Sequence, residues 1–248
     1  LETHSALAIN ISENVMRDSL ILKAAALRVV VSDGEPSVQI FGNNFSNVTG
    51  YVEGVTQISL IVFEFQKETS SSIIFQKNSF VENTLVLKGL NPSVMGYKNC
   101  LVYLFNVNSS IIMKNNTFRK NCVGTSTPFL VTYSRAILID ELLFIHQSSF
   151  FRSAVGYSTT AIYIATQHLT VTRSHFESNY ARAGGAMSID YLIKDETATL
   201  NASLIRTLIV DITGNNFTNN FAEVRGGAIC FEQLRDWALN GSEEKTLL

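Results

Sequence analysis

Short apolar runs recur along the chain, and each is followed by a polar segment that ends in a phenylalanine. Ile73-Ile74-Phe75 leads into Gln76-Lys77-Asn78-Ser79-Phe80, and the same order occurs at 38–45, 111–118, 142–150, 169–176 and 208–217. The runs are short and rich in β-branched residues, which is typical of strands. Helical periodicity is not sustained anywhere, and only 15–26 and 232–239 are expected to form a loop or a short helix.

The phenylalanine that ends each polar segment opens a Phe-x-x-Asn motif. The motif is complete at Phe80, Phe118, Phe176 and Phe217, has serine in the last place at Phe150, and is degenerate at Phe45. The six key phenylalanines are separated by 35, 38, 32, 26 and 41 residues. A second strand-like run follows most motifs after a connection of variable length, at 100–105, 128–133, 160–165, 184–189 and 226–231.

Repeats of a few dozen residues, built from short strands and fixed corners, indicate a solenoid. We therefore predict an all-β fold of about six or seven stacked coils with variable outward loops. The chain 1–248 is expected to be a single segment of a longer rod. Clear repeats cover 38–231, a less regular coil covers 1–37, and 232–248 begin a further coil or loop.

Equivalent residues of stacked coils lie at the spacing of neighbouring strands, about 4.8 Å. The key phenylalanines are therefore predicted to form an interior column of rings, and the motif asparagines a ladder of hydrogen-bonded amides. The glycine pairs 184–185 and 226–227 suit a tight corner or the close packing of one coil on the next. The predicted column contains Phe45, Phe80, Phe118, Phe150, Phe176 and Phe217, and the predicted ladder contains Asn83, Asn121, Asn179 and Asn220.

Phe-x-x-Asn followed by Gly-Gly-Ala-(Ile/Met) resembles the repeats of chlamydial polymorphic outer-membrane proteins. It is also similar to pectin-lyase-like repeats in very large surface proteins of protists, ciliates among them. Both halves of the motif occur at 176–186 and 217–229, and the resemblance covers roughly 38–231. It implies a right-handed parallel β-helix, as those families have.

The composition argues against two classes of partner. Charged residues make up 16% of the chain, the net charge is −2, and the basic residues form no run, so nucleic acid is not an expected partner. No apolar run approaches the roughly 18 residues of a membrane-spanning helix. Few charges and many Ser, Thr and Asn predict a surface solvated by hydroxyls and amides.

Two further patterns bear on the cellular or extracellular compartment of the protein. Cys100 and Cys122 each follow a Lys-Asn pair, so they either form a disulfide in an oxidising compartment or remain two buried thiols. Asn-x-Ser/Thr sequons, which accept glycans in secreted eukaryotic proteins, are frequent. They occur at Asn10, Asn44, Asn47, Asn108, Asn115, Asn201, Asn216 and Asn240. These sequons favour an extracellular or cell-surface location, and for Asn216 an inward or an outward side chain is equally compatible with the sequence.

Candidate chemistry is sparse. The adjacent acids Asp140-Glu141 would point to opposite faces of a strand, and 195–196 and 243–244 are expected in solvated segments. His146 and His175 fall in polar corners and are expected to face solvent. We predict no metal ion, cofactor or catalytic group.

Two functions remain open. The first is an extracellular structural or adhesive module of a large, glycosylated surface or fibre-forming protein, without catalysis. Its partners would be further segments or copies of the same protein, and also glycans or other surface proteins. The second is a polysaccharide-binding or polysaccharide-degrading β-helix. Charged residues gathered along a groove would favour the second, and an uncharged polar face the first.

Overall fold

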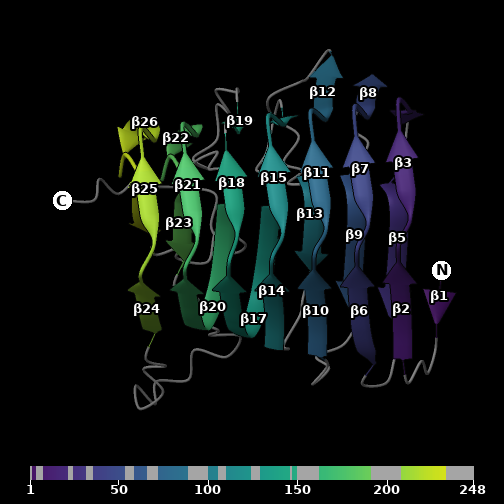
Figure 1. Cartoon of the computed structure of the whole chain (residues 1–248), viewed down its shortest axis with the longest axis horizontal. Coiled ribbons are helices and arrows are strands. Elements are labelled where there is room, and N and C mark those ends of the chain that lie inside the picture. Colours follow the sequence, from purple (N-terminus) through teal and green to yellow (C-terminus); the bar gives the residue numbers. More distant parts are fainter. Residues whose placement is uncertain are drawn as a thin grey trace, which may run out of the picture.

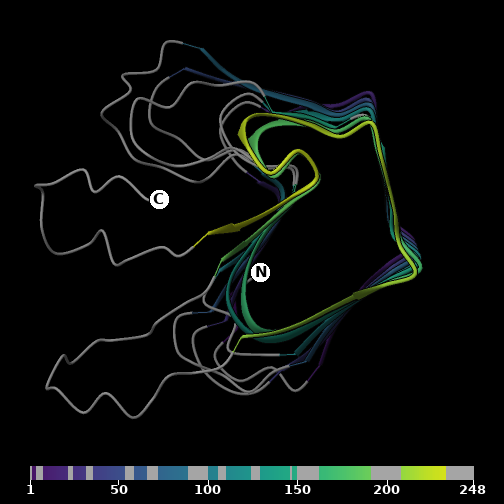
Figure 2. The ribbon, with the colours of Figure 1, turned by 90° about the vertical axis from the view of Figure 1, so that its left-hand side faces the viewer.

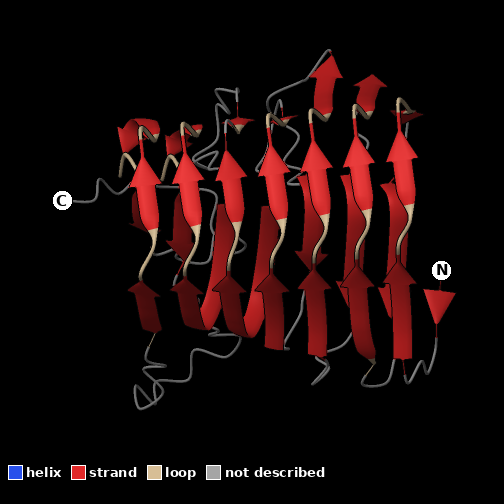
Figure 3. Ribbon diagram, viewed as in Figure 1, coloured by secondary structure: helices blue, strands red, loops and turns tan. Residues whose placement is uncertain are grey.

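The computed structural model describes residues 2–3, 8–21, 25–31, 36–53, 59–65, 72–88, 100–105, 110–123, 129–145, 147–149, 162–190 and 208–232. Within this part the secondary structure consists of strands, and every strand pair is parallel (Figure 3). The strands form three sheets of 13, 7 and 7 strands. Strands adjacent in a sheet come from successive repeats, which is the arrangement of a parallel β-helix.

Seven coils are stacked, in agreement with the six or seven predicted. In Figure 1 the chain rises along the front strands, passes over the top and descends behind, while it advances from β2 toward β24. This winding is right-handed. Figure 2, which looks along the stack, shows the coils superimposed.

Each coil has four strand positions. The first-position strands are β2 (Ala8–Ser12), β6 (Ser37–Phe41), β10 (Ser72–Gln76), β14 (Ser110–Lys114), the second parts of β17 (Phe129–Asp140) and β20 (Ile162–Thr172), and β24 (Ile209–Thr213). The second-position strands are β3 (Val15–Arg17), β7 (Asn44–Ser46), β11 (Ser79–Val81), β15 (Thr117–Arg119), β18 (Leu143–Ile145), β21 (His175–Glu177) and β25 (Asn216–Thr218).

The third-position strands are β4 (Leu20–Ile21), β8 (Thr49–Glu53), β12 (Thr84–Lys88), β16 (Cys122–Val123), β19 (Ser148–Ser149), β22 (Tyr180–Ala183) and β26 (Phe221–Arg225). The return strands are β5 (Ala25–Val31), β9 (Ser59–Phe65), β13 (Cys100–Phe105), the first parts of β17 and β20, β23 (Met187–Asp190) and β27 (Ile229–Glu232). β1 (Glu2–Thr3) pairs with Val30 and Val31 of β5. First and return strands belong to the 13-stranded sheet, because β17 and β20 run through both positions.

The first coil differs from its prediction in one respect. Residues 15–26 were expected to form a loop or a short helix, but the described residues form β3, β4 and the start of β5. Val15 and Leu20 are 64% and 61% exposed. An apolar pattern that includes such outward residues resembles a helical face in the sequence, although register with the next coil fixes it as strand.

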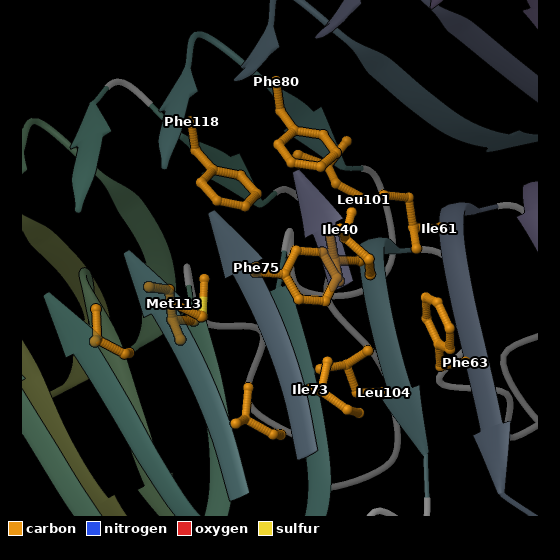
Figure 4. Close-up of a cluster of buried hydrophobic side chains, with 14 of the residues drawn as sticks. Ile40, Ile61, Phe63, Ile73, Phe75, Phe80, Leu101, Leu104, Met113 and Phe118 are labelled. Atoms are coloured by element: carbon orange, nitrogen blue, oxygen red, sulfur yellow. The ribbon is translucent and has the colours of Figure 1, made fainter. Parts of the chain in front are cut away.

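The hydrophobic core fills the interior of the coils. Side chains at alternate positions point inward, so that Ile40, Phe75 and Met113 lie in consecutive coils and are buried (Figure 4). Phe63 and Leu104 approach the same interior from the return strands. On the outer side of the return strands, Val62, Cys100 and Tyr103 form a second, smaller buried cluster. Core burial on this scale supplies the main stabilisation, at about 1.5–3 kcal/mol for each large apolar side chain.

The glycine pair 184–185 performs both functions predicted for it, and Gly226 of the second pair performs the first. Gly184 and Gly226 have φ values of 54° and 57°, which glycine adopts without strain. A Cβ on Gly185 would stand 2.2 Å from the carbonyl oxygen of Gly227 in the next coil. The first glycine of the pair therefore turns the chain, and the second permits close contact between coils.

Candidate functional site

Two corners of every coil carry the features that distinguish this molecule. The first corner joins the first and second strands, and the second corner joins the second and third. At each corner whose residues are all described, one residue has a left-handed backbone, and the next residue belongs to the stack of corner side chains. The left-handed residues are Glu13, Gly42, Lys77, Asn115, Glu141, Arg173 and Gly214 at the first corner, and Asp18, Asn47, Glu82, Lys120, Ser178 and Asn219 at the second.

A left-handed conformation costs a non-glycine residue about 1–2 kcal/mol. It is tolerated here because the following residue is held in the stack, in most coils by hydrogen bonds of its polar side chain to neighbouring coils and after Asn47 and Glu141 by burial of Val48 and Leu142. Backbone bonds between coils also continue through the corners: the amide of Lys77 donates to the Lys114 carbonyl at 3.0 Å, and that of Glu82 to the Arg119 carbonyl at 2.9 Å. The corners are thus part of the stacking.

The first-corner ladder was missed in the sequence analysis. Asn14, Asn43, Asn78 and Asn116 stand two residues before the ring position, and each amide bonds to the next along the stack. Nδ2 of Asn43 donates to Oδ1 of Asn78 at 2.9 Å, and Nδ2 of Asn78 to Oδ1 of Asn116 at 3.0 Å. The sequence signal was available, since the motif is Asn-x-Phe-x-x-Asn rather than Phe-x-x-Asn.

The second-corner ladder contains the four asparagines predicted for it. Asn83 donates to Asn121 at 2.9 Å, and Asn179 donates to Asn220 at 2.8 Å. Between them stands Gln147, which was not predicted; its Oε1 accepts from Asn121 at 3.1 Å, and its backbone amide donates to Asn179 at 3.0 Å. The longer glutamine side chain takes the place of an asparagine in the fifth coil.

A ladder amide that has amides on both sides is fully hydrogen-bonded, as Asn83 shows. Oδ1 of Asn121 accepts both from Nδ2 and from the backbone amide of Asn83. The remaining Nδ2 hydrogen of Asn83 donates to the carbonyl of Phe45 in the preceding coil, at 2.9 Å. Asn83 is fully buried, and full pairing removes the penalty for burying its amide.

Both ladders share one direction. In each link between two asparagines, the donor belongs to the earlier coil and the acceptor oxygen to the later coil. The amide dipoles are therefore aligned along the stack, and aligned hydrogen bonds strengthen one another. The two ends of such a ladder differ: donors remain at the late end and acceptors at the early end.

The column of phenylalanine rings contains five of the six predicted members. Rings of Phe45 and Phe80 lie 5.1 Å apart, those of Phe80 and Phe118 4.6 Å, and those of Phe176 and Phe217 4.7 Å, all nearly parallel. Phe144 occupies the fifth coil, at 5.3 Å from Phe118 and 6.1 Å from Phe176.

The choice of Phe150 for that coil was wrong. Phe150 itself lies outside the described residues. Phe144 pairs in register with both Phe118 and Phe176, so the spacings on either side are 26 and then 32 residues, the reverse of the predicted order. The error arose because Gln147, rather than asparagine, follows Phe144 by three residues, so that the Phe-x-x-Asn motif is not complete there.

Leu142 interrupts the first-corner ladder, and a charged cluster spans the interruption on the outer surface. Asp140, in the same coil as Leu142, is 6% exposed. Its carboxylate accepts hydrogen bonds from Nε of Arg173 at 2.9 Å and from Oγ1 of Thr172 at 3.0 Å, both in the next coil. Nζ of Lys114, in the preceding coil, lies 3.6 Å from the same carboxylate. Asp140 thereby links three coils where the amides cannot.

The guanidinium of Arg173 also reaches Glu141, with Nη1 to Oε1 at 3.2 Å. Asp140 and Glu141 were expected to face opposite sides of a strand. They converge on one cation because Glu141 is the left-handed corner residue, with φ of 52°, and lies beyond the end of the strand. Both carboxylates are therefore engaged by a protein cation.

The hydrogen bond from Arg173 lowers the pKa of Asp140 below its ordinary value, and Thr172 and Lys114 act in the same direction against the effect of burial. The same contact raises the pKa of Arg173. A general acid needs the opposite shift, toward neutral pH. The electrostatics of this cluster are those of a structural ion pair.

The outer face of the second-position strands was the test between the two functional hypotheses. It carries mostly Ser, Thr, Asn and aliphatic side chains, and its charged residues Arg17, Arg119 and Glu177 stand on strands that are not neighbours. Two other described ion pairs, Arg28–Glu64 and Lys120–Glu82, each join adjacent coils. Charges are thus spread along the rod as links between coils.

Two further polar contacts lie away from the Asp140 cluster. Nε2 of His175 lies 3.0 Å from Oε2 of Glu177, and the hydroxyl of Tyr180 donates to Glu223. His146 lies outside the described residues, as do the acid pairs at 195–196 and 243–244. Among the described residues, no group of three or more His, Cys, Asp or Glu is placed to hold a metal ion.

The described sequons face outward. Asn10, Asn115 and Asn216 are exposed, Asn44 is half-buried, and Nδ2 of the exposed Asn47 donates to Asp18 at 2.7 Å. The side chain of Asn216 is outward, and Oγ1 of Thr218 donates to its Oδ1 at 2.7 Å. Asn108, Asn201 and Asn240 lie outside the described residues.

Cys100 and Cys122 are not joined by a disulfide. They stand on β13 and β16, which belong to different sheets. Cys100 is buried in the smaller cluster, and burial raises the pKa of the Cys122 thiol, which disfavours its reactive thiolate. Of the two alternatives, the structure has the thiols.

No known protein family, curated protein or solved structure matches the chain. Within the part of the chain that the structure describes, no helix could cross a membrane.

Proposed function

We propose that this chain is a structural module: a stiff β-helical spacer of a large extracellular or cell-surface protein, without catalytic activity. The observation that carries the proposal is the pair of corner ladders, each aligned along the long axis. The ladders place hydrogen bonds between successive coils and so stiffen the rod. The charged cluster around Asp140 links coils in the same way, through ion pairs among protein side chains.

The resemblance of Phe-x-x-Asn and Gly-Gly-Ala-(Ile/Met) to repeats of polymorphic outer-membrane proteins and of protist surface proteins supports the same proposal. The stacked coils agree with the fold of those families. The module can also serve in adhesion, and its candidate partners are then further segments of the same protein, other surface proteins and glycans.

Glycosylation follows from a surface location. The exposed sequons Asn10, Asn115 and Asn216 are the best candidates, because a glycan there would point away from the stack. Intact-mass measurement of protein from its native source, before and after endoglycosidase treatment, tests this part. A mass loss that disappears in an Asn216→Gln variant assigns that site, and an unchanged mass removes the glycoprotein argument.

The rival function, a polysaccharide-degrading enzyme, is tested by incubating the purified chain with a panel of plant, fungal and bacterial polysaccharides. The spacer proposal expects no reducing ends and no unsaturated products above a heat-treated control. Turnover that survives repurification and is lost in a single acidic variant would overturn the proposal.

A further inference from the structure

The fourth coil pairs with its two neighbours through equivalent strands but through different side chains. The contact between two successive coils is here called a junction and is numbered by the coils that it joins. At junctions 3/4 and 4/5 the strands of the first three positions pair equally, over five, three and two residues. The return strands pair at both junctions as well. A difference in strength between these junctions therefore comes from the corners and the core.

Junction 3/4 is crossed by three ladder hydrogen bonds at each corner. At the first corner, Oδ1 of Asn116 accepts from the backbone amide and from Nδ2 of Asn78, both at 3.0 Å. Nδ2 of Asn116 donates in turn to the Phe75 carbonyl at 2.9 Å. The second corner repeats this arrangement with the ladder asparagines of the third and fourth coils. Both corners thus bind the third coil to the fourth.

Junction 4/5 keeps a single ladder bond among the described residues. At the first corner, the side chain of Leu142 can neither accept from Asn116 nor donate to the fourth coil. At the second corner, Oε1 of Gln147 accepts from Nδ2 of Asn121 at 3.1 Å, while its Nε2 donates within its own coil to the Ile145 carbonyl. The described residues supply no acceptor for the backbone amides of the two buried fourth-coil asparagines. In the described part of the chain, no other junction has so few ladder bonds.

The column of rings changes at the same junction. The rings of Phe80 and Phe118 lie 4.6 Å apart with an angle of 10° between their planes, whereas those of Phe118 and Phe144 lie 5.3 Å apart with an angle of 40°. Rings that are farther apart and tilted share less contact area. Nζ of Lys114 reaches across to Asp140 at 3.6 Å, but the lysine side chain is 42% exposed. An exposed ion pair of this kind contributes little to stability.

Junction 5/6 does not share this weakness, because the charged cluster crosses it. Nε of Arg173 donates to Asp140 at 2.9 Å, and Nη1 of Arg173 lies 3.2 Å from Oε1 of Glu141. The backbone amide of Leu142 donates to Oγ of Ser174 at 3.1 Å. The fifth coil is therefore bound more firmly to the sixth coil than to the fourth.

We propose that junction 4/5 is the point at which the rod opens first, separating the first four coils from the last three while both blocks keep their structure. In a solenoid each coil contacts only its neighbours, so local opening occurs at the junction of lowest stability. In a spacer, such a point determines where the rod yields under tension, and the other junctions stay closed. This consequence rests on the proposed function.

Amide hydrogen exchange of the purified whole chain, followed residue by residue by nuclear magnetic resonance, tests the inference. The left-handed corner residues are matched probes, because the backbone amide of each donates to the next coil at 2.9 to 3.1 Å. The probes are Lys77 and Glu82 for junction 3/4, and Asn115 and Lys120 for junction 4/5. After correction for intrinsic rates, the two amides that cross junction 4/5 are expected to exchange roughly tenfold faster or more than the two that cross junction 3/4.

Two further amides distinguish opening of the junction from unfolding of the fourth coil. Thr117 and Cys122 belong to the same coil as Asn115 and Lys120, but their amides donate backward to carbonyls of the third coil, both at 2.8 Å. They are expected to remain as protected as the amides that cross junction 3/4. Unfolding of the whole coil would instead expose all four amides at one rate.

Leu142→Asn is expected to strengthen the junction. Its Oδ1 can accept from Asn116, and its Nδ2 can donate to the Met113 carbonyl, which is equivalent in register to that of Phe75. Exchange of the two amides across junction 4/5 should then slow roughly tenfold.

Val48→Asn is the matched control. Val48 is also a buried apolar residue in a corner ladder, and its backbone amide donates to Asn83 of the third coil. Because Val48 lies in the second coil, its substitution is expected to leave exchange across junction 4/5 unchanged. Circular dichroism checks that both variants keep their β structure.

Equal protection of the matched corner amides in the wild type would overturn the inference, and this comparison needs no variant. So would a single exchange rate for all four amides of the fourth coil, or a folded Leu142→Asn variant that exchanges as the wild type does. Each of these outcomes leaves the spacer function standing, because a rod of uniform strength can also act as a spacer. Polysaccharide turnover would remove the spacer function instead and would leave the exchange pattern as it is.

Discussion

Nδ2 of Asn83 donates to Oδ1 of Asn121 at 2.9 Å, although 38 residues separate them in the chain. The pair is buried between two coils, and each amide is also bound to the backbone of a neighbouring coil. A contact of this kind is a link along the long axis of the molecule. Its contribution to the free energy of unfolding shows how strongly the corners hold the coils together.

Replacing Asn83 by alanine is expected to lower the free energy of unfolding by about 2–4 kcal/mol, because it leaves the Val48 amide and the Phe45 carbonyl buried without partners. Asn10→Ala is the control, since Asn10 is exposed on β2, and it should change the free energy of unfolding by less than about 0.5 kcal/mol. Urea denaturation measures both. Equal losses in the two variants would mean that the ladder contributes no special stability.

The ring column gives a second prediction. Phe118, which is 1% exposed, contacts the rings of Phe80 and Phe144, so Phe118→Ala should cost about 3–5 kcal/mol of stability. Phe221 also stacks on a ring, that of Tyr180, but is 56% exposed. Phe221→Ala should therefore cost under about 1 kcal/mol. The same denaturation experiment compares the pair, and a reversal of the order would contradict the assigned orientation of the two strands.

The glycine pairs allow a comparison of identical substitutions. Gly185→Ala forces a Cβ against the backbone of the next coil and should destabilise the chain by about 1–3 kcal/mol. Gly227→Ala should change the stability little, because among the described residues the nearest atom to its Cβ would be the Asn220 carbonyl oxygen at 3.7 Å. Thermal unfolding measures both. A large loss from Gly227→Ala would show that the last coil is covered within the chain.

Asp140 predicts a pH dependence. Its pKa is lowered in the folded protein by Arg173, so the stabilisation that it provides is present above the ordinary pKa of about 3.9 and is lost as the pH falls through the folded value. Asp140→Asn should therefore be less stable than the wild type at neutral pH, and the difference should shrink below about pH 4. Melting temperatures measured from neutral to acidic pH test the sign. A stability difference that stays constant with pH would mean that the charge of the Asp140 carboxylate is not the source of the stabilisation.

Much of the fold could be predicted because stacked coils repeat the same local rules. Each coil needs an apolar strand, a corner and a ring, so the pattern Ile-Ile-Phe followed by Asn-Ser-Phe at 73–80 was enough to predict a strand, a corner and a ring. The repetition also identified the second-corner asparagines. A side chain that is buried at the same place in most coils recurs as the same residue type in most repeats.

The remainder depended on register, which single repeats do not encode. Phe144 and Phe150 both follow an apolar run, and only pairing with Phe118 and Phe176 distinguishes them. The convergence of Asp140 and Glu141 on Arg173 requires the left-handed backbone of Glu141. Glutamate rarely has this conformation, so the sequence does not predict it. Such features arise from contacts between coils and appear only when the coils are stacked.

The spacer function is tested most directly by electron microscopy of the native assembly, labelled with an antibody against this chain. The account predicts label on thin, straight rods whose axial repeat is about 4.8 Å, the spacing between coils. Label on compact, separate particles that lack this repeat would contradict it.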